Sequence, residues 1–305
     1  MIIDEDILQR FEAGLNPQEV EASAIPAELL GYGEISAIFR IQGDTSIAYK
    51  RMPLFSDRTT AEDFREKYYE YCGLLAEAGL TVPDSQAPIV EVAGRPTAIY
   101  VSQTQLPVER FAHKLIHILD EKETEDLIVR IVLEIGKVWK FNEAHRPGLE
   151  LAIDGQISNW VSLEEGSQLF YIDTSTPLYR KAGVEQLDPE LILQAAPSFL
   201  RWIVRWLFLD DVMNRYYDPR LVFIDVAANL YKEQKPELID STIEIINRHL
   251  PYGVEPVTVE QVQKYYREDK LIWSLFLALR RLDRWITTRL LGKRYEFILP
   301  GKIKR

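Results

Sequence analysis

The chain has 305 residues, and its 36 Lys and Arg against 47 Asp and Glu give a formal net charge of -11. This balance excludes a generally basic nucleic-acid-binding surface. Hydrophobic residues make up 47% of the sequence and charged residues 27%, the composition of a protein with a buried core rather than of a disordered or fibrous chain. A length of 305 residues predicts about two domains.

The sequence gives no sign of export or of a membrane span. The single cysteine, Cys72, cannot form an internal disulfide, which fits a reducing compartment. The first residues, MIIDEDILQRF, are acidic where a secretory signal carries positive charge. The most apolar stretch, residues 199–209, contains Arg201 and Arg205 and is too short to cross a bilayer. We therefore expect a cytoplasmic protein without a transmembrane segment.

The first third of the chain reads as strands around one helix. Two β-rich runs within residues 35–53 flank a Gly-Asp pair and predict a hairpin. Residues 59–79 begin with threonines, contain helix formers and end at a glycine, so they predict a helix of roughly five turns. Two extended runs follow at 87–92 and 95–103. This order predicts a small α+β unit over residues 1–103.

The remainder, residues 104–305, has mostly helical periodicity. One helix is predicted at about residues 124–144 and others between 189 and 250. Residues 157–173 interrupt them with two apolar runs around a Glu-Glu-Gly-Ser turn, which predicts a short hairpin. Large aromatic residues at helical spacing predict a core-facing stripe: Phe199, Trp202, Trp206 and Phe208.

Polar and glycine residues with possible chemical roles are spread along both parts. Each of them alone is common in a turn, a strand or a wet helix surface. Their joint order and spacing match the layout that phosphoryl transfer requires, with a loop over the phosphates, a strand lysine, a helix glutamate, and catalytic and metal-binding oxygens. In chain order they are Gly31 and Gly33, Lys50, Glu66 and Glu70, Asp154 with Asn159 five residues later, and Asp173.

In this layout the sequence resembles the protein-kinase-like superfamily, particularly its branch of aminoglycoside phosphotransferases and choline kinases. The resemblance covers about residues 29–230, and GLLAEAGLTVPDS at 73–85 is similar to a helix and turn of that branch. It implies a bilobal α+β fold. A small β-rich N-lobe with one helix would comprise residues 1–103, and a larger, mostly helical C-lobe with the catalytic loop and the metal-binding hairpin would comprise residues 104–305.

The resemblance implies an ATP- and Mg²⁺-dependent phosphotransferase acting on a hydroxyl of a small molecule. Asp154 would accept the proton of that hydroxyl as the catalytic base, and Asn159 and Asp173 would supply oxygen ligands to magnesium. The nucleotide would contact residues of the first lobe: Gly31, Gly33 and Ser36 over the phosphates, Lys50 at the α and β phosphates, and the backbone near Gln103 and Gln105 at the adenine. Three acidic residues after Asp173 would favour a cationic or polyhydroxylated acceptor: Asp210, Asp211 and Asp218.

A glutamate on the helix at 59–79 is expected to hold Lys50. Glu70 is the first choice because Leu74 and Ala78 continue its face inward, and Glu66, one turn earlier, is the alternative.

Two departures from the resembled pattern leave a second hypothesis open. Ala152 stands where the family carries a histidine two residues before the catalytic aspartate, and Glu34 places a negative charge directly after the glycine turn. These residues favour a nucleotide-binding pseudokinase that acts as a regulatory or interaction module. Transfer of another part of the nucleotide, such as AMP, onto a protein is a third possibility.

The C-terminal part of this acidic chain is basic. Residues 280–305 contain nine Lys and Arg, with Asp283 and Glu296 as the acids. An apolar stripe precedes and enters this segment, and we expect it to pack on the helical lobe; contact with a membrane surface or an acidic partner is the alternative. The stripe consists of Leu271, Leu275, Leu279, Leu282 and Ile286.

Overall fold

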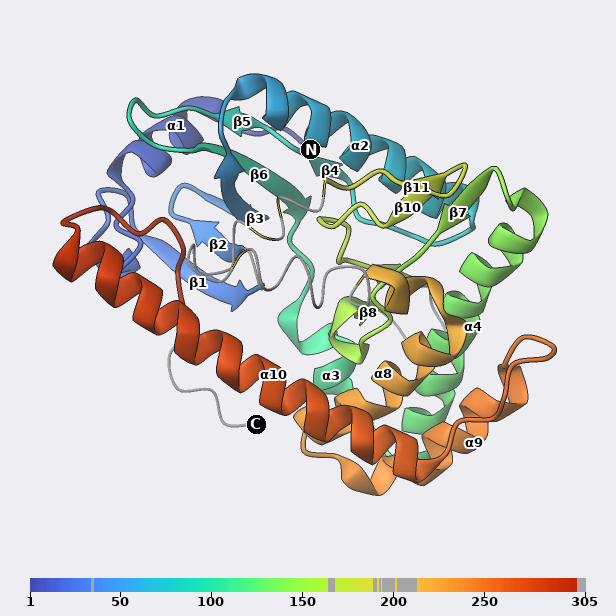
Figure 1. Cartoon of the computed structure of the whole chain (residues 1–305). Helices are drawn as coiled ribbons and strands as arrows, with labels where there is room; N and C mark the ends of the chain where they lie inside the picture. Colours follow the sequence, from blue (N-terminus) through green and yellow to red (C-terminus); the bar gives the residue numbers. More distant parts are fainter. Residues whose placement is uncertain are drawn as a thin grey trace.

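The computed structural model describes residues 1–300 except 34–35, 164–167, 189–190, 192, 194–200 and 202–212. Glu34, the aromatic stripe at 199–208, Asp210 and Asp211 therefore lie outside the described residues, as does the Glu-Glu-Gly-Ser turn predicted within 157–173. The described part is a mixed α/β structure in which a sheet lies beside a mostly helical part (Figure 1).

An antiparallel six-stranded sheet forms the N-terminal part. Its strand order is β1-β2-β3-β6-β4, with β5 also paired to β6. The predicted hairpin is present as β2 and β3, which meet at Gly43, where a φ of +100° suits glycine. The strand bounds are Ala27–Tyr32 (β1), Ala37–Ile41 (β2), Asp44–Phe55 (β3), Ser85–Gln86 (β4), Ile89–Val90 (β5) and Thr97–Thr104 (β6).

A helix covers each face of the sheet. Successive side chains of a strand point to opposite faces, so both faces carry side chains that a helix can bury. Helix α1 (Glu5–Gly14) packs Phe11 against one face, in a cluster with Tyr49 of β3. Helix α2 (Arg58–Glu77) packs Phe64 against the other face, in a cluster with Met52 of β3. Lys50 lies between these two β3 positions and therefore shares the α2 face with Met52.

The cluster under α2 continues without a break into the helical part, so the two parts share one core. The predicted helix near 124–144 is present as α4, which begins with a reciprocal cap between Asp120 and Glu123. The predicted hairpin of 157–173 is present as the paired strands β8 and β9. The helices are α3 (Ala112–Leu115), α4 (Glu121–His145), α8 (Pro219–Lys232), α9 (Ile239–His249) and α10 (Val259–Trp285).

Short elements connect these helices. The strands are β7 (Leu149–Leu151), β8 (Trp160–Ser162), β9 (Leu169–Tyr171), β10 (Tyr179–Lys181) and β11 (Val184–Glu185). The 3₁₀ turns are η1 (Val20–Ala22), η2 (Val108–Arg110), η3 (Ile157–Asn159), η4 (Arg215–Tyr217) and η5 (Pro236–Leu238), and a π-helical turn, η6 (Ile286–Leu290), follows α10.

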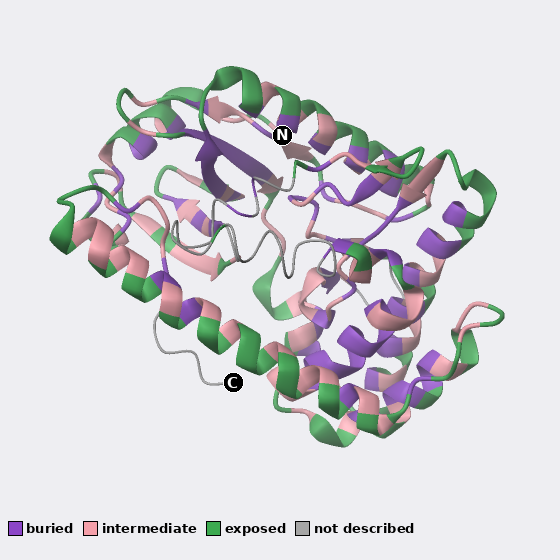
Figure 2. Ribbon diagram, viewed as in Figure 1, coloured by how far each residue is buried: buried purple, intermediate pink, exposed green. Residues whose placement is uncertain are grey.

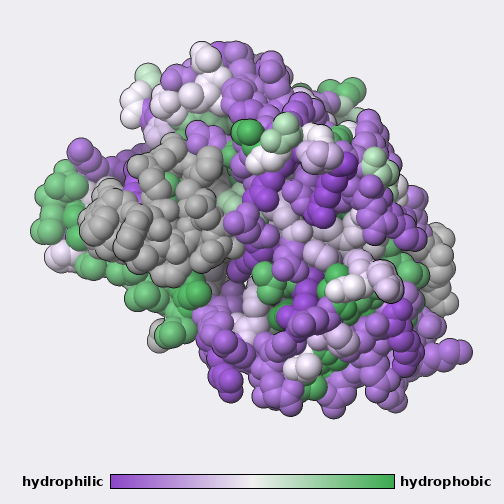
Figure 3. All heavy atoms as spheres, turned by 45° about the vertical axis from the view of Figure 1, so that its right-hand side comes forward, coloured by the Kyte–Doolittle hydropathy of each residue, from purple (hydrophilic) through white to green (hydrophobic). Residues whose placement is uncertain are grey.

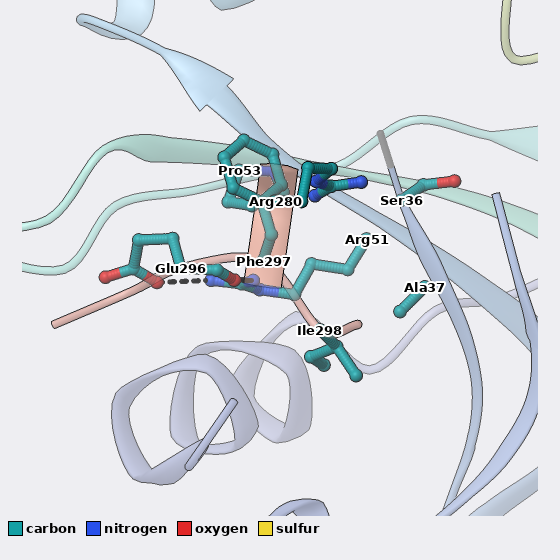
Figure 4. Close-up of a pocket in the computed structure, with 8 residues that line it drawn as sticks. All are labelled: Ser36, Ala37, Arg51, Pro53, Arg280, Glu296, Phe297 and Ile298. Carbon is teal, nitrogen blue, oxygen red and sulfur yellow. Dashed lines mark hydrogen bonds and ion pairs between the residues drawn. The ribbon is translucent and has the colours of Figure 1, made fainter. Parts of the chain in front are cut away.

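Helix α10 runs from the helical part toward the sheet, and the segment after it returns onto the sheet (Figure 1). Tyr295 and Leu299 are buried there, and Ile298 packs against the α1 cluster. Figure 4 shows Glu296 and Phe297 of this segment beside Arg51 of β3 and Arg280 of α10. Residues 295–299, which the predicted boundary at residue 104 places with the helical lobe, thus pack beside the sheet.

The apolar stripe of α10 is not packed as expected. Leu271, Leu275 and Leu282 are exposed, and the side of the helix that packs inward carries Val262 and Leu277 instead. Figure 2 shows α10 as mainly exposed or half-buried along its length, whereas β3, β6 and α8 are largely buried. Within the described residues, no helix combines the length and the apolarity needed to cross a membrane.

Candidate functional site

A cavity of about 300 Å³ lies where the β1–β3 edge of the sheet meets the β8–β9 hairpin and α10. Its wall combines residues that are far apart in the sequence. Residues of the predicted site that line it are Gly33, Ser36, Lys50, Asp154, Asn159 and Asp173.

An ion pair joins the two parts of the protein at this cavity. The Lys50 ammonium nitrogen lies 2.8 Å from Oδ1 of Asp173, although 123 residues separate them in the sequence. Burial acts to raise the pKa of Asp173, but the charge and hydrogen bond of Lys50 outweigh it and hold that pKa below its usual value. The hydroxyl of Ser175 donates a further hydrogen bond of 3.2 Å to the same oxygen. Asp173 is therefore an ionised carboxylate at neutral pH.

The loop between β7 and β8 holds Asp154 in place through backbone and side-chain hydrogen bonds. Nδ2 of Asn159 donates to the Asp154 carbonyl at 3.1 Å, and the Asp154 N–H donates to the Tyr171 hydroxyl at 3.2 Å. The backbone N–H of Gln156 donates to Oδ1 of Asp154 at 3.1 Å. Ile172, next to Asp173, donates its N–H to the Asn159 carbonyl at 3.0 Å, so the loop and the hairpin are one hydrogen-bonded unit.

Two glycines let side chains approach closely at this site. A Cβ on Gly155 would lie 2.9 Å from Cγ1 of Val222 in α8 and 3.0 Å from Cδ1 of Ile135 in α4. A Cβ on Gly33 would overlap the Ser36 hydroxyl oxygen. Glycine at 155 therefore seats the Asp154 loop against the helices, and glycine at 33 leaves room for Ser36 beside the cavity.

Asp154 has an unusual electrostatic environment. Burial and the nearby carboxylates of Asp225 and Asp173 raise its pKa to about 7. Asp225 lies on α8 and is 6% exposed, and its Oδ1 has no hydrogen-bond partner in the described part of the chain. The sequence reading missed Asp225, although an acidic residue within the apolar run LVFIDVAANL of α8 is a detectable signal.

We predict that Asp225→Asn lowers the pKa of Asp154, because it removes one of the negative charges that raise it. A shift of up to about one pH unit is expected for a neighbouring carboxylate. Carbon-13 NMR titration of the Asp154 carboxyl measures this directly, with Asp240→Asn on the exposed surface of α9 as the control. An unchanged midpoint in Asp225→Asn would show that Asp225 does not contribute to the raised pKa of Asp154.

The glutamates predicted to hold Lys50 lie elsewhere. Glu70 forms an ion pair of 2.6 Å with Lys181 and accepts a 2.7 Å hydrogen bond from the Tyr179 hydroxyl, and Glu66 is exposed. The prediction of a Lys50–glutamate pair is therefore wrong for this structure. The cause is the orientation of α2, whose inward face is built from aromatic and aliphatic side chains: Phe64, Tyr68, Tyr71 and Leu75.

The backbone groups of Gln103 and Gln105, which were predicted to contact the adenine, form hydrogen bonds with neighbouring strands instead. Gln103 pairs with Ala48 on one side and Ser85 on the other, and the Gln105 N–H donates to the Ser46 carbonyl at 2.8 Å. The Gln103 side chain donates to the Ile172 carbonyl at 3.1 Å and to the Thr174 hydroxyl at 2.9 Å.

Gly31, predicted to lie over the phosphates, is likewise a strand residue, paired with Ile38. Gln103 therefore supports the hairpin from the sheet, whereas Gly31 and Gln105 are engaged with neighbouring strands, and none of these three residues lines the cavity.

Ala152, at the position of the missing histidine, is fully buried. Its carbonyl accepts a 2.8 Å hydrogen bond from the hydroxyl of Tyr71 on α2, and its N–H donates to the Leu178 carbonyl at 2.9 Å. A tyrosine from the sheet side thus anchors the segment before Asp154.

The side of the cavity formed by the helices was not predicted. Lys232 of α8 and Asp269 of α10 form an ion pair of 3.2 Å there, beside Trp273 and Arg215. The charge of Arg215 acts to lower the pKa of Asp154, against the larger effects of burial and the two carboxylates. No group of three or more His, Cys, Asp and Glu among the described residues has the geometry to hold a metal ion by itself.

Comparison with known proteins identifies a family. No curated protein matches the chain. A solved structure described as "WaaP in complex with acyl carrier protein" is 12% identical, with a TM-score of 0.35, and the match covers 80% of this chain and 90% of that one. The sequence model of one family matches residues 17–284, most of the chain. The protein belongs to that family, the family of unknown function DUF6206.

Proposed function

We propose that the protein is an ATP-dependent phosphotransferase that acts on a hydroxyl group of a small molecule. The observation that carries this proposal is the contact of Lys50 and Asp173 at 2.8 Å in a cavity that Asp154 and Asn159 also line. A cation beside several oxygen-bearing side chains suits a polyphosphate and the charge that develops when a phosphoryl group is transferred. In this proposal the sheet and the helical part are the lobes of a bilobal, protein-kinase-like fold.

The residues present fit a nucleotide and a divalent cation. Ser36 is 8% exposed, and its hydroxyl has no hydrogen-bond partner in the described part of the chain, so it is a donor suited to a phosphate oxygen. Lys50 supplies the positive charge next to it. Asp173 and Asn159 would hold Mg²⁺, which when bound neutralises phosphate charge and keeps several waters of its own.

Asp154 has the properties of a general base. With a pKa of about 7 it is partly ionised at neutral pH, which is the range in which a base accepts a proton most effectively. The hydrogen bonds from Asn159 and Gln156 orient it, and its carboxylate borders the cavity. We propose that Asp154 orients the acceptor hydroxyl and removes its proton as the oxygen attacks the terminal phosphorus of ATP. The bond from that phosphorus to the bridging oxygen breaks, and ADP leaves with its electron pair.

A nucleotide-binding pseudokinase is the second candidate. The observation that favours it is the engagement of Lys50 by Asp173 in place of a helix glutamate, together with alanine at position 152. A pseudokinase would bind ATP through Lys50 without turning it over. Binding and turnover therefore have to be measured separately.

ATP with Mg²⁺ is expected to stabilise the wild type by about 5 °C at a ligand concentration near one hundred times Kd. Lys50→Met should lose most of this shift, measured against its own unliganded Tm, because it removes the cation at the phosphates. Lys181→Met is the matched control, since Lys181 pairs with Glu70 and does not line the cavity. A thermal-shift titration tests this. The absence of any response in the wild type would refute both the enzyme and the pseudokinase.

A further inference from the structure

The outward face of α10 exposes a row of large apolar side chains. Leu271 is 70% exposed, Leu275 57%, Leu282 45% and Trp285 53%. Their spacing of four, seven and three residues places them on one side of the helix. Two further leucines after the helix, Leu290 and Leu291, are 65% and 59% exposed. Figure 3 shows hydrophobic side chains gathered at one edge of a mostly hydrophilic surface.

The opposite side of α10 is occupied by the protein itself. Leu277 and Arg280 are buried there, and Asp269 and Trp273 line the cavity. The helix therefore already uses one face for folding, and the apolar row is an additional face. An exposed row of this size is unusual on a soluble surface unless something binds it.

Basic residues accompany the apolar row. Arg267 and Lys270 are exposed at the turn before Leu271, and Arg289 and Lys293 are exposed beyond Trp285. The acids nearby are Glu268, which lies 3.9 Å from Lys264, and the half-buried Asp283. The surface is thus apolar along its centre and positively charged at both ends, within a chain whose net charge is -11.

We propose that this face of α10 binds the surface of a membrane that contains anionic lipids. A helix with leucines and a tryptophan on one face and basic residues around it lies in the interface, with its apolar side chains among the acyl chains and its cations at the headgroups. From Leu271 to Trp285 the row spans about 20 Å, and tryptophan is favoured at the depth of the headgroups.

Charge distinguishes a membrane from a second copy of the chain. Two copies joined through this face would bring Arg267, Lys270, Arg289 and Lys293 of each chain near the same residues of the other, and like charges oppose that contact. Anionic headgroups instead complement all four. Because Trp273 faces the cavity on the same helix, docking would hold the cavity about one helix diameter from the headgroups. This inference does not depend on the proposed phosphotransfer.

Vesicle co-sedimentation of the full chain tests the proposal. We expect binding to vesicles of equal parts phosphatidylcholine and phosphatidylglycerol, and weaker binding to phosphatidylcholine alone. The double variant Leu271→Gln, Leu275→Gln should bind the anionic vesicles at least about tenfold more weakly, because two inserted side chains are lost. Leu133→Gln on α4 is the matched control, since Leu133 is 50% exposed and lies outside the row.

The charged residues are tested separately with Arg267→Gln, Lys270→Gln, which should weaken binding to anionic vesicles about tenfold and leave binding to neutral vesicles unchanged. Unfolding temperatures of all variants are measured alongside, and because the changed residues are exposed they should match the wild type. Wild-type binding to neither vesicle, or equal binding by the leucine variant, overturns the proposal. A wild-type dimer in solution that Leu271→Gln, Leu275→Gln converts to monomer would overturn it in favour of a second copy.

Discussion

Asp154→Asn is expected to lower the rate of phosphoryl transfer about 10²- to 10⁴-fold, because the amide cannot accept the proton of the acceptor hydroxyl. The same substitution should raise the free energy of unfolding at alkaline pH. Burial and the carboxylates of Asp225 and Asp173 make the ionised form of Asp154 unfavourable in the folded protein. Asparagine removes this charge and keeps an oxygen that accepts the Gln156 N–H. An active-site residue that lowers stability is a known cost of function.

The pH dependence of this gain follows from the raised pKa. The folded state holds its proton up to about pH 7, whereas the ordinary value is 3.8, so ionisation of Asp154 opposes folding increasingly as the pH rises through that interval. The gain in Asp154→Asn should therefore be close to zero at pH 4 and about 1 to 3 kcal/mol at pH 8. Urea unfolding at both pH values, together with assays of ATP turnover, measures the two effects.

Asp240→Asn on the exposed surface of α9 serves as the control and should change stability by less than about 0.5 kcal/mol. If Asp154→Asn turns over ATP at the wild-type rate, Asp154 is not the base. If the wild type binds ATP without turning it over, the pseudokinase is the better description. A loss of stability at pH 8 would contradict the raised pKa.

Arg51→Met is expected to destabilise the protein by about 3 to 5 kcal/mol, the cost of leaving a buried charge without its partner. Arg51 is 2% exposed and donates two hydrogen bonds of 2.6 Å to the carboxylate of Glu12, which is 1% exposed. It also lies 2.9 Å from Glu296. The contacts with Glu12 fasten α1 to β3, and the contact with Glu296, drawn in Figure 4, fastens the C-terminal segment to β3. Arg95, 3.7 Å from Glu12, compensates the lost charge in part.

The ion pairs of Arg51 with Glu12 and Glu296 should also make the stability of the protein depend on pH. Burial acts to raise the pKa of Glu12, but the hydrogen bond and charge of Arg51 hold it below its usual value of 4.5. The ion pair therefore contributes stability above pH 4.5 that is lost as the pH falls further. Arg51→Met should lack this acid-dependent loss. Arg58→Met is the matched control, because Arg58 is 54% exposed in its pair with Glu62 and should change the stability far less than Arg51→Met. Equal free energies of unfolding of the two variants in urea would refute the stabilising role of the Arg51 ion pairs.

Elements with strong local signals could be predicted from the sequence. The β2–β3 hairpin follows from two β-rich runs around Gly43, and α4 follows from a long helical period. Lys50, Asp154, Asn159 and Asp173 could be selected together because their joint order and spacing match the layout that phosphoryl transfer requires. The structure brings them to one cavity.

Features that depend on the rotation of a helix could not be predicted. Successive side chains along α2 differ in direction by about 100°. The prediction placed Glu70 on the inward face because Leu74 and Ala78 continue its face. In the structure, the inward face carries Tyr68 and Tyr71 instead. The apolar period of α10 likewise predicts an amphipathic helix, but it does not determine which side of that helix packs against the rest of the protein. Asp225 needed the packing of α8 against the Asp154 loop before its role was visible.

The central claim is that Lys50, Asn159 and Asp173 form one site for the phosphates of ATP and a divalent cation. A crystal structure with Mn²⁺ and a non-hydrolysable ATP analogue tests it most directly, because manganese is located by its anomalous scattering. We predict a manganese peak about 2 Å from oxygens of Asn159 and Asp173, with the phosphates beside Lys50. A nucleotide or a manganese ion bound away from these residues, or no binding by active protein, would contradict the claim.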